Sequence, residues 1–298
     1  MEEVVYIHKP VMLEKVMEYL QVTPGKIIVD ATIGLGGHST EILKALKNEG
    51  LLIGIDRDEE SLSIAEERLR KIAKNFKLYS TTYDYIPKIL EDLNIQKVDG
   101  ILFDLGFSSF HIEESGRGFS FQRLEEPLDM RFSKGVTKAT AADILNNFSE
   151  KELEDIFKNF GEEPYAKKIA KAVVEKRREK PFSKVNDLVE LIEKIVPRSK
   201  KHPATRVFQA LRIAVNDELK NLEKALSTTH EILNLRGRVV FLTYHSLEDR
   251  IVKTFLKQNQ DKFYILTKKV AKPSFEEVRN NPRARSAKLR AGERREVK

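Results

Sequence analysis

Short apolar runs alternate with helix-like segments over the first third of the chain. The apolar runs are residues 26–30, 51–56, 76–80 and 98–104, and the segments between them, with apolar residues every three to four positions, are 39–47, 59–73 and 85–93. Buried strands that alternate with amphipathic helices form a parallel sheet covered on both faces. We therefore expect an α/β fold with a Rossmann-like, doubly wound sheet.

The alternation stops after the fourth strand. Residues 113–138 are rich in Gly, Ser and charged side chains, and only helical patterns follow, including one long helix expected from Ala204 to beyond Leu226. A strand pattern returns at 239–244, followed by a helix at 247–256 and by a closing pair of edge strands at 263–266 and 287–290. We expect a discontinuous domain, 1–112 and 213–298, interrupted by an all-helical inserted domain, 113–212.

Composition restricts the class of protein. Of 298 residues, 41% are hydrophobic and 33% are charged, which is typical of a folded, well-solvated chain. The chain has no cysteine, so disulfides and thiolate metal sites are excluded. Acidic residues follow Met1 where a signal peptide would be basic, and no apolar run approaches the roughly 18 residues of a membrane helix. We expect a cytoplasmic protein with no membrane contact.

Basic residues gather in two stretches, 176–206 and 279–298, within a net charge of +7. Clustered cations suit a polyphosphate backbone, although a merely solvated face has the same composition. We expect the first stretch, with Arg177 and Arg178, to help the inserted domain bind RNA. Aromatic residues are sparse in the sequence near both stretches, so a platform for stacking single-stranded bases is not evident.

A glycine-rich turn joins the first strand to the first helix after it. The turn carries Gly34, Gly36, Gly37 and His38, and Asp56 ends the second strand twenty residues past Gly36. Glycines let a ligand approach the backbone, the helix N-terminus offers free N–H groups, and a carboxylate at this spacing can accept both hydroxyls of a ribose. The pattern favours an adenosine cofactor, and the alternative is a tight turn beside a surface carboxylate.

The turn narrows the choice of cofactor. No Lys precedes Ser39, as a phosphate-binding P-loop would require, and the third glycine of a dinucleotide site is missing at Ser39. Asp30 instead suits the ammonium group of S-adenosylmethionine, reached through water or backbone. Tyr83, just past the third strand, is expected to border the adenine, and His111 lies in the loop beyond the fourth strand. Each of these side chains is equally compatible with a purely structural role.

The expected chemistry centres on Asp104, which ends the fourth strand and should open into the crevice at the carboxyl edge of the sheet. Asp104 and Phe107 have the separation of the acid and aromatic residue in the Asp-Pro-Pro-Tyr motif of DNA amino-methyltransferases. A carboxylate that accepts one N–H of an exocyclic amine improves this poor nucleophile, and an aromatic face can hold the base. His245 and Ser246, after the fifth strand, are candidates to contact the target base. The histidines show no metal-ligand spacing.

Eight segments in order resemble one known family. They are 8–12, 30–39, 54–58, 104–109, 116–121, 128–131, 204–213 and 244–250, and they closely resemble the bacterial 16S rRNA cytosine-N4 methyltransferases almost end to end. The resemblance implies a class I S-adenosylmethionine-dependent methyltransferase fold and methylation of a decoding-region cytosine within the small ribosomal subunit. It also implies cofactor contacts at Gly36, Gly37, His38, Asp56, Tyr83, Asp104 and His111. No metal is expected, because the histidines show no metal-ligand spacing.

Two other functions remain open from the residues alone. A nicotinamide-dependent oxidoreductase could use a similar sheet, although the glycine pattern and the basic surfaces disfavour it. A ribosome-assembly or RNA-binding factor could keep the fold without turnover, although such a protein would not need a pocket with both Asp56 and Asp104.

Overall fold

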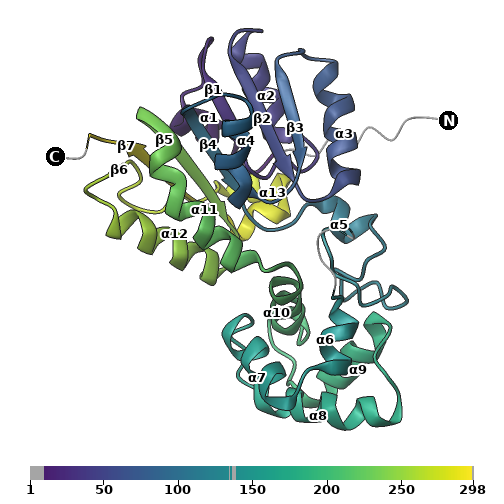
Figure 1. The fold of residues 1–298 in the computed structure, drawn as a ribbon. Helices are drawn as coiled ribbons and strands as arrows, with labels where there is room; N and C mark the ends of the chain where they lie inside the picture. Colours follow the sequence, from purple (N-terminus) through teal and green to yellow (C-terminus); the bar gives the residue numbers. More distant parts are fainter. Residues whose placement is uncertain (1–9, 134, 136–138, 297–298) are drawn as a thin grey trace. The chain divides into compact units, whose positions relative to one another are not determined.

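The computed structural model describes residues 10–133, 135 and 139–296, which form two compact units. Unit 1 is built from the chain up to Phe107 and from Leu219 onward, and unit 2 comprises residues 108–218 (Figure 1). His8 and Lys9 of the first family-like segment lie outside the described residues. None of the described helices is long and apolar enough to cross a membrane.

Unit 1 contains a seven-stranded sheet in the order β3-β2-β1-β4-β5-β7-β6. Its strands are β1 (Ile27–Asp30), β2 (Leu51–Asp56), β3 (Phe76–Ser80), β4 (Val98–Asp104), β5 (Leu233–Thr243), β6 (Phe263–Ile265) and β7 (Lys288–Arg294). The first five are parallel, and β7 runs antiparallel between β5 and β6. The expected strands, including the closing pair, are confirmed.

Helices cover both faces of this sheet. They are α1 (Leu13–Leu20), α2 (Gly37–Leu46), α3 (Glu59–Arg70), α4 (Ile86–Asp92), α11 (Glu218–Ile232), α12 (Ser246–Gln258) and α13 (Phe275–Asn280), with short 3-10 turns at Tyr83–Tyr85 and Pro282–Ser286. Successive strand residues enter separate cores: Ile28 packs with α1, α2 and α3, and Val29 packs with α4, α11 and α12. Burial on both faces explains the unbroken apolar runs in the sequence, and the Rossmann-like, doubly wound sheet is confirmed.

The regular elements of unit 2, within its described residues, are helices. Its helices are α5 (Ser109–Glu113), α6 (Ala141–Asn147), α7 (Glu150–Asn159), α8 (Ala166–Glu179), α9 (Val185–Ile195) and α10 (Thr205–Asn216). The apolar faces of α6 to α10 form a core of their own, which contains Phe157, Ile169, Leu188 and Leu211. Hydroxyl side chains cap the first two long helices, because Thr140 accepts from the N–H of Asp143 and Ser149 from that of Glu152.

The single long helix expected from Ala204 is wrong. The backbone of Asp217 has a φ of 50°, in the left-handed region, and this residue separates α10 from α11. An aspartate tolerates this conformation better than most side chains. The helix therefore ends at this residue, although the spacing of apolar residues in the sequence continues past it. The end expected for the inserted domain, residue 212, therefore lies inside α10, and unit 2 continues to Glu218.

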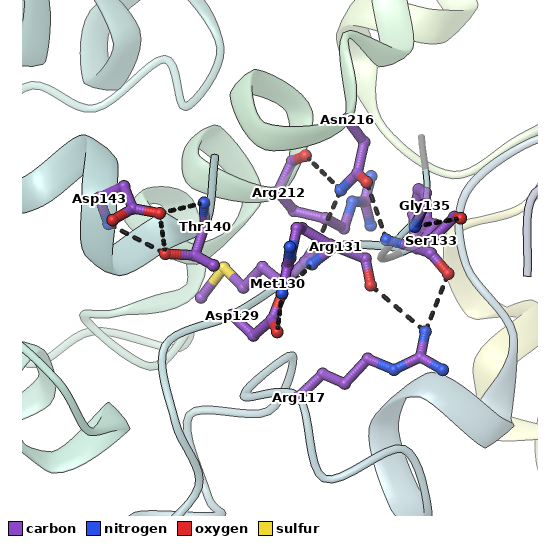
Figure 2. Close-up of polar contacts among 11 residues, drawn as sticks. Arg117, Asp129, Met130, Arg131, Ser133, Gly135, Thr140, Asp143, Arg212 and Asn216 are labelled. Atoms are coloured by element: carbon purple, nitrogen blue, oxygen red, sulfur yellow. Dashed lines mark hydrogen bonds and ion pairs between the residues drawn. The ribbon is translucent and has the colours of Figure 1, made fainter. Parts of the chain in front are cut away.

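A polar cluster fixes the irregular segment 129–133 in unit 2 (Figure 2). Asn216 accepts the N–H of Phe132 at 2.9 Å and donates to the carbonyl of Met130 at 2.8 Å. Arg117 donates to the carbonyl of Phe132 at 2.8 Å, and Arg212 forms a buried ion pair with Glu218 at 2.8 Å. The side chains thus satisfy backbone groups of a segment that has no partners in a helix or strand.

Candidate functional site

The glycine turn predicted from the sequence forms a corner between β1 and α2. Gly34 and Gly36 have φ angles of 50° and 77°, and Gly37 begins the helix. The corner is tied to the next strand, because the N–H of Gly34 donates to Oδ2 of Asp56 at 2.9 Å. A Cβ atom added at Gly36 would lie 3.4 Å from Cβ of Ala65, so a side chain there would crowd the corner as well as strain it.

Asp30, the last residue of β1, stabilises the glycine corner through hydrogen bonds. Its side chain is 1% exposed, accepts the hydroxyl of Ser39 at 2.7 Å and accepts the N–H of Thr32 at 3.3 Å. Burial raises the pKa of Asp30 to about 6, against the opposing effects of the Ser39 hydrogen bond and of nearby His38. Asp30 therefore fixes both ends of the turn, which agrees with an indirect contribution to ligand binding.

Asp104 lies at the end of β4, and its side chain is held at several points. The hydroxyl of Tyr244 donates to Oδ1 at 2.7 Å, and Nδ1 of His38 lies 3.4 Å from Oδ2. The backbone N–H of Asp104 donates to the hydroxyl of Thr32 at 2.6 Å. Burial raises the pKa of Asp104 to about 7, opposed by the Tyr244 hydrogen bond and reinforced by the charge of Glu248. A carboxyl group with this pKa can exchange a proton near neutral pH.

His38 connects this carboxyl group to the first turn of α2. Its ring is buried, and Nε2 lies 2.9 Å from the carbonyl oxygen of Val11. Because a carbonyl only accepts, Nε2 carries the proton and Nδ1 faces Asp104. Burial lowers the pKa of His38, which favours the neutral ring. His38 therefore presents a proton acceptor toward Asp104.

The residues after β5 organise the start of α12. Nδ1 of His245 accepts the N–H of Glu248 at 3.4 Å, and Nε2 of His245 lies 3.0 Å from Oε1 of Glu248. Oε2 of the buried Glu248 accepts the N–H of Tyr244 at 2.9 Å. His245 thus caps the helix, whereas Ser246, the first helical residue, is exposed. Of these two predicted base contacts, Ser246 has the more accessible side chain.

The three remaining predicted site residues occupy different surroundings. Tyr83 follows β3 and packs edge-on against Phe103 with ring centroids 5.8 Å apart. Phe107 is 37% exposed at the end of this part of unit 1.

His111 belongs to unit 2, where its ring packs against Phe119 and Phe132 and its Nδ1 accepts the N–H of Ser108 at 3.2 Å. The structure therefore brings together the corner, Asp56, His38 and Asp104 in unit 1. It gives His111 a packing role in unit 2.

Two contributors to this site were not singled out from the sequence. Tyr244 was seen only as part of a motif, yet it donates directly to Asp104. Glu248 is a turn further along α12, and its buried charge acts on the pKa of Asp104. The available signal was the position of both residues just after the strand that pairs with β4, because parallel neighbours end at the same edge.

The corner fits an adenosine-type ligand that carries an amino-acid group. Positive φ angles at Gly34 and Gly36 leave the backbone open, and the first N–H groups of α2 have no partner within the helix. Asp56 ends β2 beside the corner, where carboxylate oxygens can accept ribose hydroxyls. No cluster of three or more His, Asp or Glu side chains with the geometry of a metal site occurs within residues 10–133, 135 and 139–296.

The basic stretch 176–206 is divided between two roles. Nη1 of Arg177 donates to the carbonyls of Leu145 and Phe148 at 2.8 and 2.6 Å, and Lys176 donates to the carbonyl of Asp187. Arg177 therefore stabilises the end of α6, and the expected contact of Arg177 and Arg178 with RNA stays a prediction. Of the exposed cations in this stretch, Lys180 and Lys184 form ion pairs, whereas Arg198, Lys200 and Lys201 lie together in the loop after α9.

Comparison with known proteins gives matches along nearly the whole chain. A family model described as "MraW methylase family" matches residues 5–295. "Ribosomal RNA small subunit methyltransferase H" of Dictyoglomus thermophilum is 64% identical over 99% of this chain and 99% of its own length. The protein of the same name from Caldicellulosiruptor saccharolyticus is 44% identical over 97% of this chain and 99% of its own length.

A solved structure with the same architecture is a putative rRNA-methylase from Clostridium thermocellum. It aligns with a TM-score of 0.50 and 14% identity, and the alignment covers 96% of this chain and 98% of that chain. At this level of identity the likeness concerns the fold alone, and it agrees with the α/β architecture expected from the sequence.

Proposed function

This chain belongs to the MraW methylase family, and we propose that it transfers a methyl group from S-adenosylmethionine to the exocyclic N4 amine of a cytosine in the decoding region of 16S rRNA. Its fold is that of a class I methyltransferase with an inserted helical unit. The observation that carries the proposal is the pairing of the glycine corner with two strand-end carboxyl groups, Asp56 and Asp104.

The corner supports the assignment of the methyl donor. When bound, S-adenosylmethionine supplies an electrophilic methyl group. The backbone at Gly34, Gly36 and Gly37 would hold its amino-acid part, and Asp56 would accept its ribose hydroxyls. Tyr83 is proposed to border the adenine.

Asp104 is proposed to act on the amine that receives the methyl group. The lone pair of an exocyclic amine is shared with the ring, and a carboxylate that accepts one N–H makes this lone pair more available. With a pKa near 7, Asp104 can then take up the proton that the nitrogen releases. The Tyr244 hydroxyl donates to Oδ1 of the carboxylate and keeps it in position, so it need not reorganise during the reaction.

The target rests on the family resemblance and on charge. Relatives that match this chain over nearly their whole length carry the name of a small-subunit rRNA methyltransferase, and this chain has a net charge of +7. We propose that unit 2 recognises RNA within the small ribosomal subunit, which would place the protein in the cytoplasm. Phe107, His245 and Ser246 are proposed to border the extruded base. Phe107 and Ser246 are exposed, whereas His245 is partly buried at the start of α12.

The test combines donor binding with mapping of the product. Purified protein is titrated with S-adenosylmethionine in a calorimeter and incubated with small subunits isolated from cells that lack this protein. Nucleosides from the treated 16S rRNA are then identified by mass spectrometry. We expect donor binding and N4-methylcytidine in a decoding-region fragment.

Other outcomes of these two measurements would each contradict a different part of the proposed function. A methyl group at another position of the base or in another RNA fragment would contradict the target. Donor binding without any methylation of subunits would favour a non-catalytic assembly factor. Heat release with a nicotinamide dinucleotide but not with the methyl donor would favour an oxidoreductase.

A further inference from the structure

The loop between α9 and α10 carries exposed cations without partners. Arg198, Lys200 and Lys201 are exposed, and among the residues that the structure describes none of their charged groups has an ion pair or a hydrogen bond. The hydroxyl of Ser199 accepts the N–H of Lys201 at 3.3 Å and donates to its carbonyl at 3.0 Å, so the backbone between the cations is held in a turn. The loop presents positive charge on an ordered backbone.

The same loop carries an aromatic ring in a fixed orientation. His202 stacks on Phe121, with ring centroids 4.4 Å apart and planes inclined by 10°. Phe121 is held in turn by an edge contact with Phe208, at 5.9 Å. The two stacked residues are about eighty positions apart in the chain, so this aromatic pair beside the cations cannot be predicted from local sequence.

Polar contacts set the rotation of the His202 ring within its plane. Nδ1 accepts the N–H of Ala204 at 3.2 Å, and Nε2 lies 3.4 Å from Oε1 of Glu193. One face of the ring is covered by Phe121, and 33% of the side chain remains exposed. A flat ring that is fixed before binding loses little conformational freedom when another ring is stacked on it.

We propose that His202 is a stacking platform for a nucleobase of the rRNA substrate, outside the methylated position, and that Arg198, Lys200 and Lys201 hold the adjoining phosphates. The inference rests on the proposed function for its choice of RNA. It assigns recognition to a particular loop of unit 2. Stacking on an aromatic face is tolerant of base identity, so the contact would provide affinity and register more than sequence selection.

The combination of features favours a nucleic acid over an acidic protein. Cations alone would suit either partner, because both carry negative charge. A planar ring fixed within a group of unpaired cations matches the repeating arrangement of base and phosphate in a single strand. Basic residues elsewhere in this part of unit 2, such as Lys180 and Lys184, are paired with Asp187 and Glu125 and lack such a ring.

A binding experiment separates stacking from charge attraction. Fluorescence anisotropy is measured with a labelled single-stranded oligoribonucleotide and with an abasic strand of equal length and charge. The wild-type protein should prefer the strand that carries bases, and His202→Ala should lose about five- to fifty-fold of that affinity while binding the abasic strand as before. His202→Phe, which keeps a stacking ring, should retain the preference.

The cations are tested through salt dependence. The double substitution of Lys200→Ala with Lys201→Ala should reduce the magnitude of the slope of log affinity against log salt by about 1.4 for both strands, because each lost phosphate contact on a single strand accounts for about 0.7. Lys158→Ala is the matched control, because Lys158 is exposed on α7 of the same unit and has no ion pair among the described residues. It should leave both the slope and the preference for bases unchanged.

The final experiment measures methylation of small subunits. His202→Ala should raise KM for the subunits about tenfold or more with kcat close to wild type, and His202→Phe should restore KM. Thermal unfolding of each variant reports whether unit 2 is folded.

If wild type methylates subunits and folded His202→Ala has the same KM as Lys158→Ala, the stacking inference is wrong while the proposed function stands. If wild type methylates no RNA, the proposed function fails first. An equal loss on both strands, or stronger binding to polyglutamate than to RNA, would also overturn stacking.

Discussion

Nδ1 of His38 lies 3.4 Å from Oδ2 of Asp104, and this contact connects the first turn of α2 with the end of the central strand β4. Nε2 of His38 is committed to the carbonyl of Val11, so one proton is needed between Nδ1 and the carboxyl oxygen for an attractive contact. The raised pKa of Asp104 and the lowered pKa of His38 both favour placing that proton on the carboxyl group near or below neutral pH.

Activity should rise with pH through about 7. The carboxylate form of Asp104 accepts the amine proton, and burial raises the pKa of this group to about 7. We expect kcat at saturating donor and subunits to increase between pH 6 and 8. Asp104→Asn should lower kcat about a hundredfold or more and flatten the profile. A profile that is unchanged in Asp104→Asn would remove this residue from the proton transfer.

The stability of the ligand-free protein should show the opposite trend with pH. The folded state keeps the proton of Asp104 up to about pH 7, whereas the unfolded chain releases it near the ordinary value of 3.8. Between these values the folded state binds more protons, so the contribution of Asp104 to the free energy of unfolding falls as pH rises.

The stability prediction is tested with the same isosteric variant. Asp104→Asn cannot ionise, so its melting temperature relative to wild type should increase from pH 5 to pH 8. The thermal unfolding of both proteins is followed by circular dichroism at several pH values. A constant difference in melting temperature would show that the pKa of Asp104 is not raised in the folded protein.

Asp56 should affect donor binding through the corner as well as directly. Its Oδ2 accepts the N–H of Gly34 at 2.9 Å, so Asp56→Ala removes both the proposed ribose acceptor and a tie on the turn. We expect at least a tenfold weaker Kd for S-adenosylmethionine by calorimetry, equivalent to about 1.4 kcal/mol. Asp56→Asn keeps one carbonyl acceptor and should lose less. Equal affinity in all three proteins would place the ribose elsewhere.

The buried ion pair between Arg212 and Glu218 should affect the free energy of unfolding strongly when only one of its two partners is removed. Arg212→Ala leaves the Glu218 carboxylate buried without its main partner and should reduce the free energy of unfolding by about 3 kcal/mol. The double variant Arg212→Met with Glu218→Leu should recover much of this loss, because apolar side chains of similar size tolerate burial. Urea unfolding gives both values, and a double variant no better than Arg212→Ala would contradict the argument.

Arg177 and Arg178 are adjacent cations with different expected roles. Arg177→Ala removes the donor to the carbonyls of Leu145 and Phe148 and should destabilise the fold by about 2 kcal/mol. Arg178 is exposed and unpaired among the described residues, so Arg178→Ala should leave the melting temperature unchanged. Similar melting temperatures for the two variants would show that the Arg177 contacts contribute little.

The sequence predicted the sheet well because burial imposes a simple pattern on its strands. Ile28 and Val29 of β1 face opposite, fully buried sides, so consecutive positions of this strand are apolar up to Asp30 at its end. The break at Asp217 could not be predicted in this way, because the apolar spacing continues across it and a single left-handed residue leaves the pattern unchanged.

Site residues that lie at the ends of buried strands could be predicted from the sequence. Site contacts that depend on tertiary packing could not. Asp56 and Asp104 end buried strands, a position that the sequence reveals. The donation from Tyr244 to Asp104 depends on β5 pairing beside β4, across a sequence separation of 140 residues. The engagement of Arg177 by the end of α6 likewise depends on how unit 2 packs, and composition shows only that the residue is basic.

The pairing of β4 with β5 has a consequence for biosynthesis. The chain emerges from the ribosome from its N-terminus, so β4 is complete long before Leu233–Thr243 has been made. Until then, the edge of β4 that β5 will occupy is an unsatisfied row of N–H and C=O groups, a template for pairing with other chains. Unit 2, whose residues all lie between these two strands, can form its separate core during that interval. The free edge of β4 in the nascent chain is therefore protected only once β5 has been synthesised and has paired with it, or by a chaperone in the meantime.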